Sequence, residues 1–373
     1  MPALVAGLGA RALVVTGRRS FTGSPLWPRL LSSLETLGVS PEHLAVEGEP
    51  SPGAVDEAVR RFWPAGIQVV LTIGGGSVID AGKAVAALLP HGSSAMDHLE
   101  GVGRSVPYAG PSLPSVAVPT TAGTGSEATR NAVLSERGPN GFKKSFRHDA
   151  LTPVQAVVDP ALIASCPRDT IAASGMDAVT QLIESFVSPR ASVFTDALAS
   201  DGLRAARTAL PVWHAGGEGT AAARSAMAYA ALLSGVCLSQ AGLGAVHGLA
   251  SPLGAFFPIP HGVICGTLLA AITRVNIEAI RAREPRNPAL ARYARVGSVL
   301  AGTEDASPDE ATGALVRMLE AWTERMTLPR LGACGVRSQD LDAVVRDCRP
   351  GSMRTNPIVL TDAELRGVLE SRL

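Results

Sequence analysis

The fold is decided by the stretch Val69-Val70-Leu71-Thr72-Ile73-Gly74-Gly75-Gly76-Ser77-Val78-Ile79-Asp80-Ala81-Gly82-Lys83. Its first five residues are apolar or β-branched and stop at three consecutive glycines, after which apolar residues recur at helical spacing as far as Leu89. A strand, a tight turn and a helix in this order are typical of parallel α/β domains.

The surrounding sequence continues this pattern and then changes character. Further strand candidates lie at 12–16, 44–46, 115–118 and 156–158, and a helical pattern covers 30–37. From Pro160 onward long helical patterns take over, at 170–188, 192–210 and 221–240. We therefore predict a doubly wound, Rossmann-like α/β domain over residues 1–159 and an all-α domain over residues 160–373.

The composition favours a small-molecule enzyme over a nucleic-acid or membrane protein. The 373 residues are 46% hydrophobic, and 33 Lys and Arg balance 33 Asp and Glu, so no global field gathers polyanions. No stretch approaches the roughly 20 uninterrupted apolar residues of a membrane-spanning helix. The five cysteines are widely spaced without a C-x-x-C pair, which is typical of reduced thiols. We expect a cytoplasmic protein without nucleic-acid or membrane partners.

The glycine run has the setting of a phosphate-binding loop. Glycines allow the backbone to approach a pyrophosphate closely, and the free N–H groups at the start of a helix favour an anion. The spacing matches neither G-x-G-x-x-G nor a P-loop, so it also fits an ordinary glycine turn between a strand and a helix. We predict cofactor contacts from Gly74, Gly75, Gly76, Ser77 and Asp80.

A second loop, Pro119-Thr120-Thr121-Ala122-Gly123-Thr124-Gly125-Ser126-Glu127, also follows a strand candidate. Taken alone, it fits an ordinary β–α turn with an N-cap. Two such loops favour a shared ligand, because doubly wound domains bind ligands outside the carboxyl ends of their strands. Its predicted cofactor contacts are Thr120, Thr121, Thr124 and Ser126.

The helical half holds a third group of residues. Asp177 and Gln181 are four residues apart and share one face of a predicted helix, and His247 and His261 bracket a stretch that contains glycine and proline. One carboxylate and two imidazoles are a known ligand set for iron or zinc. Histidines in apolar stretches are also common as core residues, so the residue types alone leave both interpretations open.

Taken together, these segments resemble the iron-containing (group III) alcohol dehydrogenases, and the similarity runs from Ala12 to the final helix. The resemblance implies that 74–83 binds the cofactor pyrophosphate, that 120–126 contacts phosphate and the nicotinamide half, and that Lys143 contacts the ribose. It also implies a metal site and a catalytic role for one set of residues, Asp177, Gln181, His247 and His261.

Two positions depart from the family pattern. Gln181 stands where the family has a ligand histidine, and Ser251 stands where many members have a histidine linked to proton transfer. Asp177, His247 and His261 still form a two-histidine, one-carboxylate set that can hold iron or zinc. Maleylacetate reductases, which are similar and can work without a metal, provide the alternative.

Basic residues and one glycine predict the charge of the substrate and the choice of cofactor. Arg130 follows the second loop and is predicted to bind a carboxylate or phosphate of the substrate, although a solvated basic hairpin gives the same pattern. NAD-selective members of the family often carry an aspartate at the position of Gly17. Its absence, with Arg18, Arg19 and Ser20 following, predicts a preference for NADP(H) over NAD(H).

We therefore expect an NAD(P)-dependent alcohol dehydrogenase or aldehyde reductase that transfers a hydride between nicotinamide and a small, anionic carbonyl substrate. We expect a homodimer or larger homo-oligomer. Metal-independent reduction of the maleylacetate reductase type is the alternative. A lyase similar to the dehydroquinate synthases, or a nucleotide-binding protein without catalysis, would share the architecture, and net oxidation of the cofactor distinguishes these possibilities.

Overall fold

A break after Ile163 divides the chain into two units in the computed structural model, which describes residues 1–138, 140–302 and 306–373. The first unit contains Met1–Thr121, Ser126–Glu136 and Phe142–Ile163. The second contains Ala122–Gly125, Arg137–Gly141 and Ala164–Leu373. Two short segments from the N-terminal half therefore belong to the helical unit.

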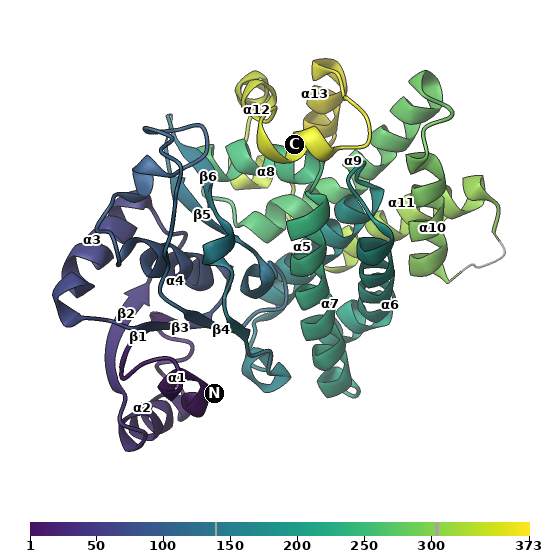
Figure 1. Ribbon diagram of the computed structural model, residues 1–373. Helices are drawn as coiled ribbons and strands as arrows, with labels where there is room; N and C mark the ends of the chain where they lie inside the picture. Colours follow the sequence, from purple (N-terminus) through teal and green to yellow (C-terminus); the bar gives the residue numbers. More distant parts are fainter. Residues whose placement is uncertain (139, 303–305) are drawn as a thin grey trace. The chain divides into compact units, whose positions relative to one another are not determined.

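The first unit is built on a parallel sheet of five strands in the order β2-β1-β3-β4-β7 (Figure 1). The strands are β1 (Arg11–Gly17), β2 (Ser40–Val46), β3 (Val69–Gly74), β4 (Ser115–Pro119) and β7 (Gln155–Ala156). The chain moves outward in one direction from β1 to β2 and in the other from β3 to β4. The topological switch point, where doubly wound folds bind ligands, therefore lies between β1 and β3.

Helices cover both faces of this sheet, which confirms the doubly wound class. Alternate residues of a strand point to opposite faces. Val14 of β1 packs in one cluster with Leu30 of α2 (Leu26–Thr36), together with α1 (Pro2–Ala6). Leu13 packs in the other cluster with Val59 of α3 (Pro52–Phe62) and Val85 of α4 (Gly76–Leu88). Apolar side chains on both faces explain the continuous apolar run of β3, because both sides of a covered parallel sheet are buried.

Two elements of the first unit refine the sequence prediction. The basic segment after the second loop is an antiparallel hairpin of β5 (Asn131–Glu136) and β6 (Phe142–Arg147). The strand expected at 156–158 is β7, which ends earlier, at Ala156. Val157 still donates a hydrogen bond to the Ala117 carbonyl, but the chain then reaches Asp159-Pro160, and proline cannot continue a ladder.

The second unit is helical, as predicted (Figure 1). Its helices are α5 (Arg168–Val187), α6 (Val193–Ala215), α7 (Thr220–Ala241), α8 (Ala245–Phe256), α9 (His261–Arg283), α10 (Ala289–Ala301), α11 (Pro308–Arg325), α12 (Leu341–Asp347) and α13 (Asp362–Ser371). By length and composition alone, α7 and α9 could cross a membrane, but 50% of the most apolar stretch of α7 and 72% of that of α9 are buried. Core helices of folded domains share this composition. All five cysteines are free thiols, as the sequence indicated.

Candidate functional site

The predicted cofactor loops meet at one edge of the sheet in the first unit. Thr16 of β1 pairs with Ile73 of β3, and Gly74 pairs with Pro119 of β4. The Thr120 N–H donates to the Gly74 carbonyl at 2.9 Å. The carboxyl ends of β1, β3 and β4 therefore bring one set of predicted residues to the same edge, namely Gly17, Gly74, Gly75, Gly76, Ser77, Thr120 and Thr121.

Positions 74 and 75 of the first loop are glycines for different structural reasons. A Cβ on Gly74 would lie 2.5 Å from the Val78 Cβ, so only glycine lets α4 start this close to β3. A Cβ on Gly75 would lie 3.4 Å from the Thr121 hydroxyl, an ordinary contact distance. Gly75 is the N-cap residue of α4 and has no side chain with which to cap it. The Val78 N–H donates to the Gly75 carbonyl, and the preceding N–H groups of Gly76 and Ser77 are available to an anion such as a pyrophosphate.

A buried lysine fixes the helix behind this loop. The Lys83 ammonium group, on α4, pairs with Asp80 at 3.1 Å and donates to the Ser126 carbonyl and the Thr129 hydroxyl, each at 2.9 Å. Burial lowers the pKa of Lys83, and Asp80 opposes this effect. Asp80 also accepts from the Ser126 hydroxyl and, at 3.0 Å, from the Val133 N–H. The carboxylate of Asp80, predicted to contact cofactor, is thus bonded within the protein.

Three basic residues predicted to contact ligands also have acidic partners. Arg18 forms an ion pair with Glu47 at 2.6 Å, and both side chains are more than 60% exposed. Lys143 pairs with Glu49. Arg130 donates from Nη1 to Asp149 at 2.7 Å, while its buried Nε has no hydrogen-bond partner among the described residues.

The middle of the second loop, Ala122–Gly125, belongs to the helical unit and carries Thr124. A Cβ on Gly123 would lie 2.7 Å from the Ser174 Cβ on α5. Gly125 has a φ of +59°, and a Cβ there would lie 2.5 Å from the Gly235 Cα on α7. These glycines are therefore required for backbone packing against two helices.

The second unit brings three of the four predicted metal ligands together. His247 of α8 places Nε2 at 3.3 Å from Oδ1 of Asp177, which lies in the middle of α5. His261, the first residue of α9, places Nε2 at 3.8 Å from the same oxygen. Asp177 and His247 are buried, whereas the His261 side chain is 26% exposed. Burial alone would raise the pKa of Asp177, but the charge of His261 and the hydrogen bond from His247 hold it below its usual value.

A buried carboxylate that the sequence analysis missed orients His247. Glu184 of α5 accepts from His247 Nδ1 at 2.6 Å and from the Val246 N–H at 2.7 Å. With Nδ1 directed at Glu184, Nε2 faces Asp177. Burial alone would lower the pKa of His247, but Cys265, Glu184 and Asp177 raise it well above its usual value. A second carboxylate behind a ligand histidine is the usual arrangement of metal sites in proteins.

Gln181, the remaining predicted ligand, accepts a hydrogen bond from a neighbouring helix. Its side-chain oxygen accepts a hydrogen bond from the Ser234 hydroxyl of α7 at 2.7 Å, and both residues are buried. Among the acidic, histidine and cysteine side chains of the described residues, the sulfur of Cys265 is a fourth donor atom beside Asp177, His247 and His261. The ligand atoms of these four residues all lie within 4.8 Å of one another. Burial raises the pKa of the Cys265 thiol to about 12.

Helical spacing places each of the two missed residues on the same helix face as a predicted ligand. Glu184 follows Asp177 by seven residues and Cys265 follows His261 by four, and both spacings place side chains on one helix face. The sequence alone does not indicate which buried polar residues share a site, because Glu184 and His247 come from different helices.

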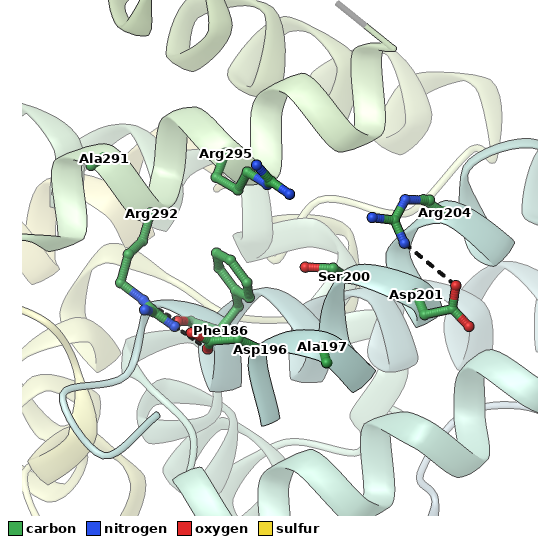
Figure 2. Close-up of a pocket in the computed structure, with 9 residues that line it drawn as sticks. All are labelled: Phe186, Asp196, Ala197, Ser200, Asp201, Arg204, Ala291, Arg292 and Arg295. Carbon is green, nitrogen blue, oxygen red and sulfur yellow. Dashed lines mark hydrogen bonds and ion pairs between the residues drawn. The ribbon is translucent and has the colours of Figure 1, made fainter. Parts of the chain in front are cut away.

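A hollow of about 660 Å³ lies elsewhere in the second unit, on α5, α6 and α10 (Figure 2). Its charged side chains largely neutralise each other. Arg292 pairs with Asp196, and Arg204 pairs with Asp201 at 3.4 Å. This hollow is lined by none of the predicted site residues.

Comparisons with known proteins agree with this architecture. Residues 1–160 match the model of the iron-containing alcohol dehydrogenases, and residues 171–373 match the C-terminal model of the same family. Alcohol dehydrogenase 4 of Schizosaccharomyces pombe is 33% identical over 88% of this chain and 74% of its own length. The 1-propanol dehydrogenase PduQ of Salmonella typhimurium is 30% identical over 99% of this chain and 98% of its own.

A solved structure is similar over nearly its whole length. It is the sulfoacetaldehyde reductase of Bifidobacterium kashiwanohense in complex with NAD+, with a TM-score of 0.83 and 26% identity over 99% of this chain and 92% of that chain. The two family models together span both units, and the relatives are named as dehydrogenases of alcohols. This chain therefore belongs to the iron-containing alcohol dehydrogenase family and is an oxidoreductase that acts on CH–OH groups.

Proposed function

We propose that this protein is a nicotinamide-dependent aldehyde reductase and alcohol dehydrogenase for a small anionic substrate. The observation that carries the proposal is the group of Asp177, His247 and His261, which places two imidazoles beside one buried carboxylate in a member of an oxidoreductase family. In the direction of reduction, C4 of the nicotinamide gives a hydride to the carbonyl carbon. The carbonyl electron pair moves to oxygen, and a proton completes the alcohol.

The donor set of the second unit fits a divalent metal. One carboxylate oxygen and two imidazole nitrogens are ligands for Fe²⁺ or Zn²⁺, and Glu184 holds the Nε2 of His247 toward Asp177. When bound, the metal supplies Lewis-acid stabilisation of the negative charge that develops on the substrate oxygen. His261 is the most accessible of these three ligands, with 26% of its side chain exposed against 6% for His247 and 2% for Asp177.

The first unit would bind the cofactor through the first turn of α4 and the hydroxyl groups of Thr120 and Thr121. We propose NADP(H) as the preferred cofactor, because Gly17 leaves no carboxylate at the end of β1 and Arg18 neutralises the nearby Glu47. Since Arg18 is well exposed, its contribution is small, and Arg18→Ala should lower kcat/KM for NADPH by about three- to tenfold. A higher kcat/KM with NADH that Arg18→Ala does not change would contradict this preference.

The anionic substrate is supported by two observations. Arg130 uses one end of its guanidinium for the exposed Asp149, and 42% of its side chain is exposed, so the group can still donate to a carboxylate, sulfonate or phosphonate. A relative with 26% identity is named as a reductase of sulfoacetaldehyde, an aldehyde with a negative charge.

Metal-independent reduction is the second candidate, and the carboxylates beside the histidines favour it. Glu184 and Asp177 face the two ring nitrogens of His247, and together with Cys265 they raise its pKa well above the usual value. Because both nitrogens of His247 are directed at carboxylates, the group that would donate to the substrate oxyanion is His261, whose side chain is partly exposed. Turnover that survives complete removal of metal by a chelator would support this candidate over the first.

One kinetic experiment tests the proposal. The protein, supplied with Fe²⁺ or Zn²⁺, is given NADPH or NADH and either neutral aldehydes or aldehydes that carry a sulfonate, phosphonate or carboxylate. We expect cofactor oxidation with a higher kcat/KM for the anionic aldehydes. His261→Ala should lower kcat about a hundredfold or more while the cofactor still binds.

A matched pair of arginine variants tests the substrate charge. Arg130→Ala should raise KM for the anionic aldehydes alone, whereas Arg147→Ala, which removes an exposed arginine of the same hairpin, should leave KM unchanged. No cofactor oxidation with any carbonyl compound would overturn the proposed function. Equal kcat/KM for neutral and anionic aldehydes would overturn only the proposed substrate class.

A further inference from the structure

We propose that Cys265 is the fourth metal ligand of this protein, so that a thiolate replaces the histidine whose position Gln181 occupies. The inference rests on the proposed metal site at Asp177, His247 and His261 and deepens it. It changes the expected site from an all-nitrogen-and-oxygen site to a mixed nitrogen, oxygen and sulfur site.

Four of the six distances among the four donor atoms are close to those of a tetrahedral metal site, and all six are within 4.8 Å. With metal–nitrogen and metal–oxygen bonds of about 2.0–2.1 Å and metal–sulfur bonds of about 2.3 Å, tetrahedral ligand atoms lie roughly 3.3–3.6 Å apart. The Cys265 sulfur lies 3.7 Å from Nε2 of His247 and 3.7 Å from Nε2 of His261. Those two nitrogens lie 3.3 Å and 3.8 Å from Asp177 Oδ1. Four separations therefore fall within a few tenths of an ångström of the values for a bound ion.

The helix that carries Cys265 explains this placement. His261 is the first residue of α9 and Cys265 lies one turn later, so both side chains project from the same face of one helix. Cys265 is fully buried, as are Asp177 and His247 to within a few per cent. Ligands held on packed helices keep their positions, so little rearrangement is needed to close the site on an ion.

The Gln181 amide already has a hydrogen-bond partner on another helix. Its side-chain oxygen accepts from Ser234, and that hydroxyl also lies 2.8 Å from the Ala231 carbonyl. The hydrogen bond from Ser234 occupies one of the two lone pairs of the amide oxygen and holds the side chain toward α7. An amide oxygen is also a weaker ligand for Zn²⁺ than a thiolate.

A sulfur ligand predicts which metal the site prefers. Thiolates favour Zn²⁺ over the oxygen-preferring ions, whereas two histidines and a carboxylate alone suit Fe²⁺. On binding, the metal–sulfur bond forms, the S–H bond breaks and the thiol proton passes to solvent. We expect this protein to bind Zn²⁺ and Co²⁺ in preference to Fe²⁺.

The wild-type protein provides the direct test. The full chain is stripped of metal with a chelator, reduced with a phosphine in thiol-free buffer, and reloaded with one equivalent of Co²⁺ or Zn²⁺. We expect a sulfur-to-cobalt charge-transfer absorption in the near ultraviolet. X-ray absorption of the zinc form should show one scatterer at about 2.3 Å beside those at about 2.0–2.1 Å.

Three variants locate the sulfur. Cys265→Ser should remove the charge-transfer absorption and weaken Zn²⁺ binding about a hundredfold or more. Cys237→Ser is the matched control, because Cys237 is equally buried in the same unit and its thiol donates to the Thr195 carbonyl at 3.6 Å. It should change neither spectrum nor affinity. Gln181→Ala should keep the charge-transfer absorption.

The outcomes separate this inference from the proposed function. Bound metal without a sulfur scatterer, or loss of metal in Gln181→Ala but not in Cys265→Ser, would overturn the thiolate ligand and leave the proposed reductase intact. Reductase activity from a protein that binds no Co²⁺ or Zn²⁺ at all would likewise overturn it. A sulfur-bound metal in a protein without any cofactor oxidation would support the ligand set and overturn the proposed reaction.

Discussion

Replacing Glu184 with glutamine should weaken metal binding without removing any metal ligand. The carboxylate accepts two hydrogen bonds, from His247 Nδ1 at 2.6 Å and from the Val246 N–H at 2.7 Å. A glutamine side chain offers one oxygen, so its NH2 group must face one of these two donors. If Nδ1 loses its acceptor, the imidazole proton can move to Nε2, and this nitrogen no longer offers a lone pair to the ion.

The size of the effect follows from the bond that is lost. A hydrogen bond to a charged group contributes about 1.5–3 kcal/mol, and 1.4 kcal/mol corresponds to about a factor of ten in affinity. We therefore expect Glu184→Gln to bind Zn²⁺ about ten- to hundredfold more weakly. Competition with a chromophoric chelator measures this difference. Cofactor binding should stay at the wild-type level.

A second buried carboxylate provides the control for Glu184→Gln. Glu127 belongs to the first unit, and burial raises its pKa, so Glu127→Gln removes a buried carboxyl group without changing the cluster around Asp177. This variant should keep wild-type affinity for Zn²⁺. Affinity for Zn²⁺ within about twofold of wild type in Glu184→Gln would show that Glu184 does not orient His247.

Two further variants test the first unit. Gly75→Val should abolish binding of NADPH and NADH, measured by calorimetry, because the valine side chain would cover the first turn of α4. A side chain at Gly75 would not clash with Val78, whereas one at Gly74 would. Unchanged affinity in the folded variant would contradict the loop assignment. Lys83→Met leaves Asp80 without its buried cation and should lower the free energy of unfolding in urea by about 3–5 kcal/mol. A loss below about 1 kcal/mol would mean that the other hydrogen bonds of Asp80 suffice.

The sequence predicts best those elements whose burial can be read from the pattern of apolar residues within the element itself. The strand at 69–73 is apolar throughout because β3 is covered on both faces, and its end is marked by glycines that the structure requires at Gly74. The helix expected at 170–188 corresponds to α5 within two residues at each end. Local pattern and tertiary burial agree in these elements, so the sequence is sufficient.

The rest depends on contacts between distant segments. The family pattern indicates position 181 as a ligand, yet the Gln181 oxygen is bonded to Ser234, 53 residues away in sequence. Cys265 has the sequence context of a core residue, because it lies in an apolar stretch of a long helix. Only the packing of α5, α8 and α9 shows that its sulfur lies beside two histidines. Likewise, nothing local indicates that Arg18 meets Glu47.

The glycine contact at Gly125 has a consequence for anyone who wishes to produce the helical unit alone. A gene fragment that starts at Ala164 would omit Ala122–Gly125, and the backbone of Gly235 would then have no loop packed against it. Water would replace the backbone contact between Gly125 and Gly235, which is too close to accommodate even one added methyl group. A stable fragment would therefore need this four-residue segment restored, for example on a circularly permuted chain, and a simple truncation at the apparent boundary would expose a groove along α7.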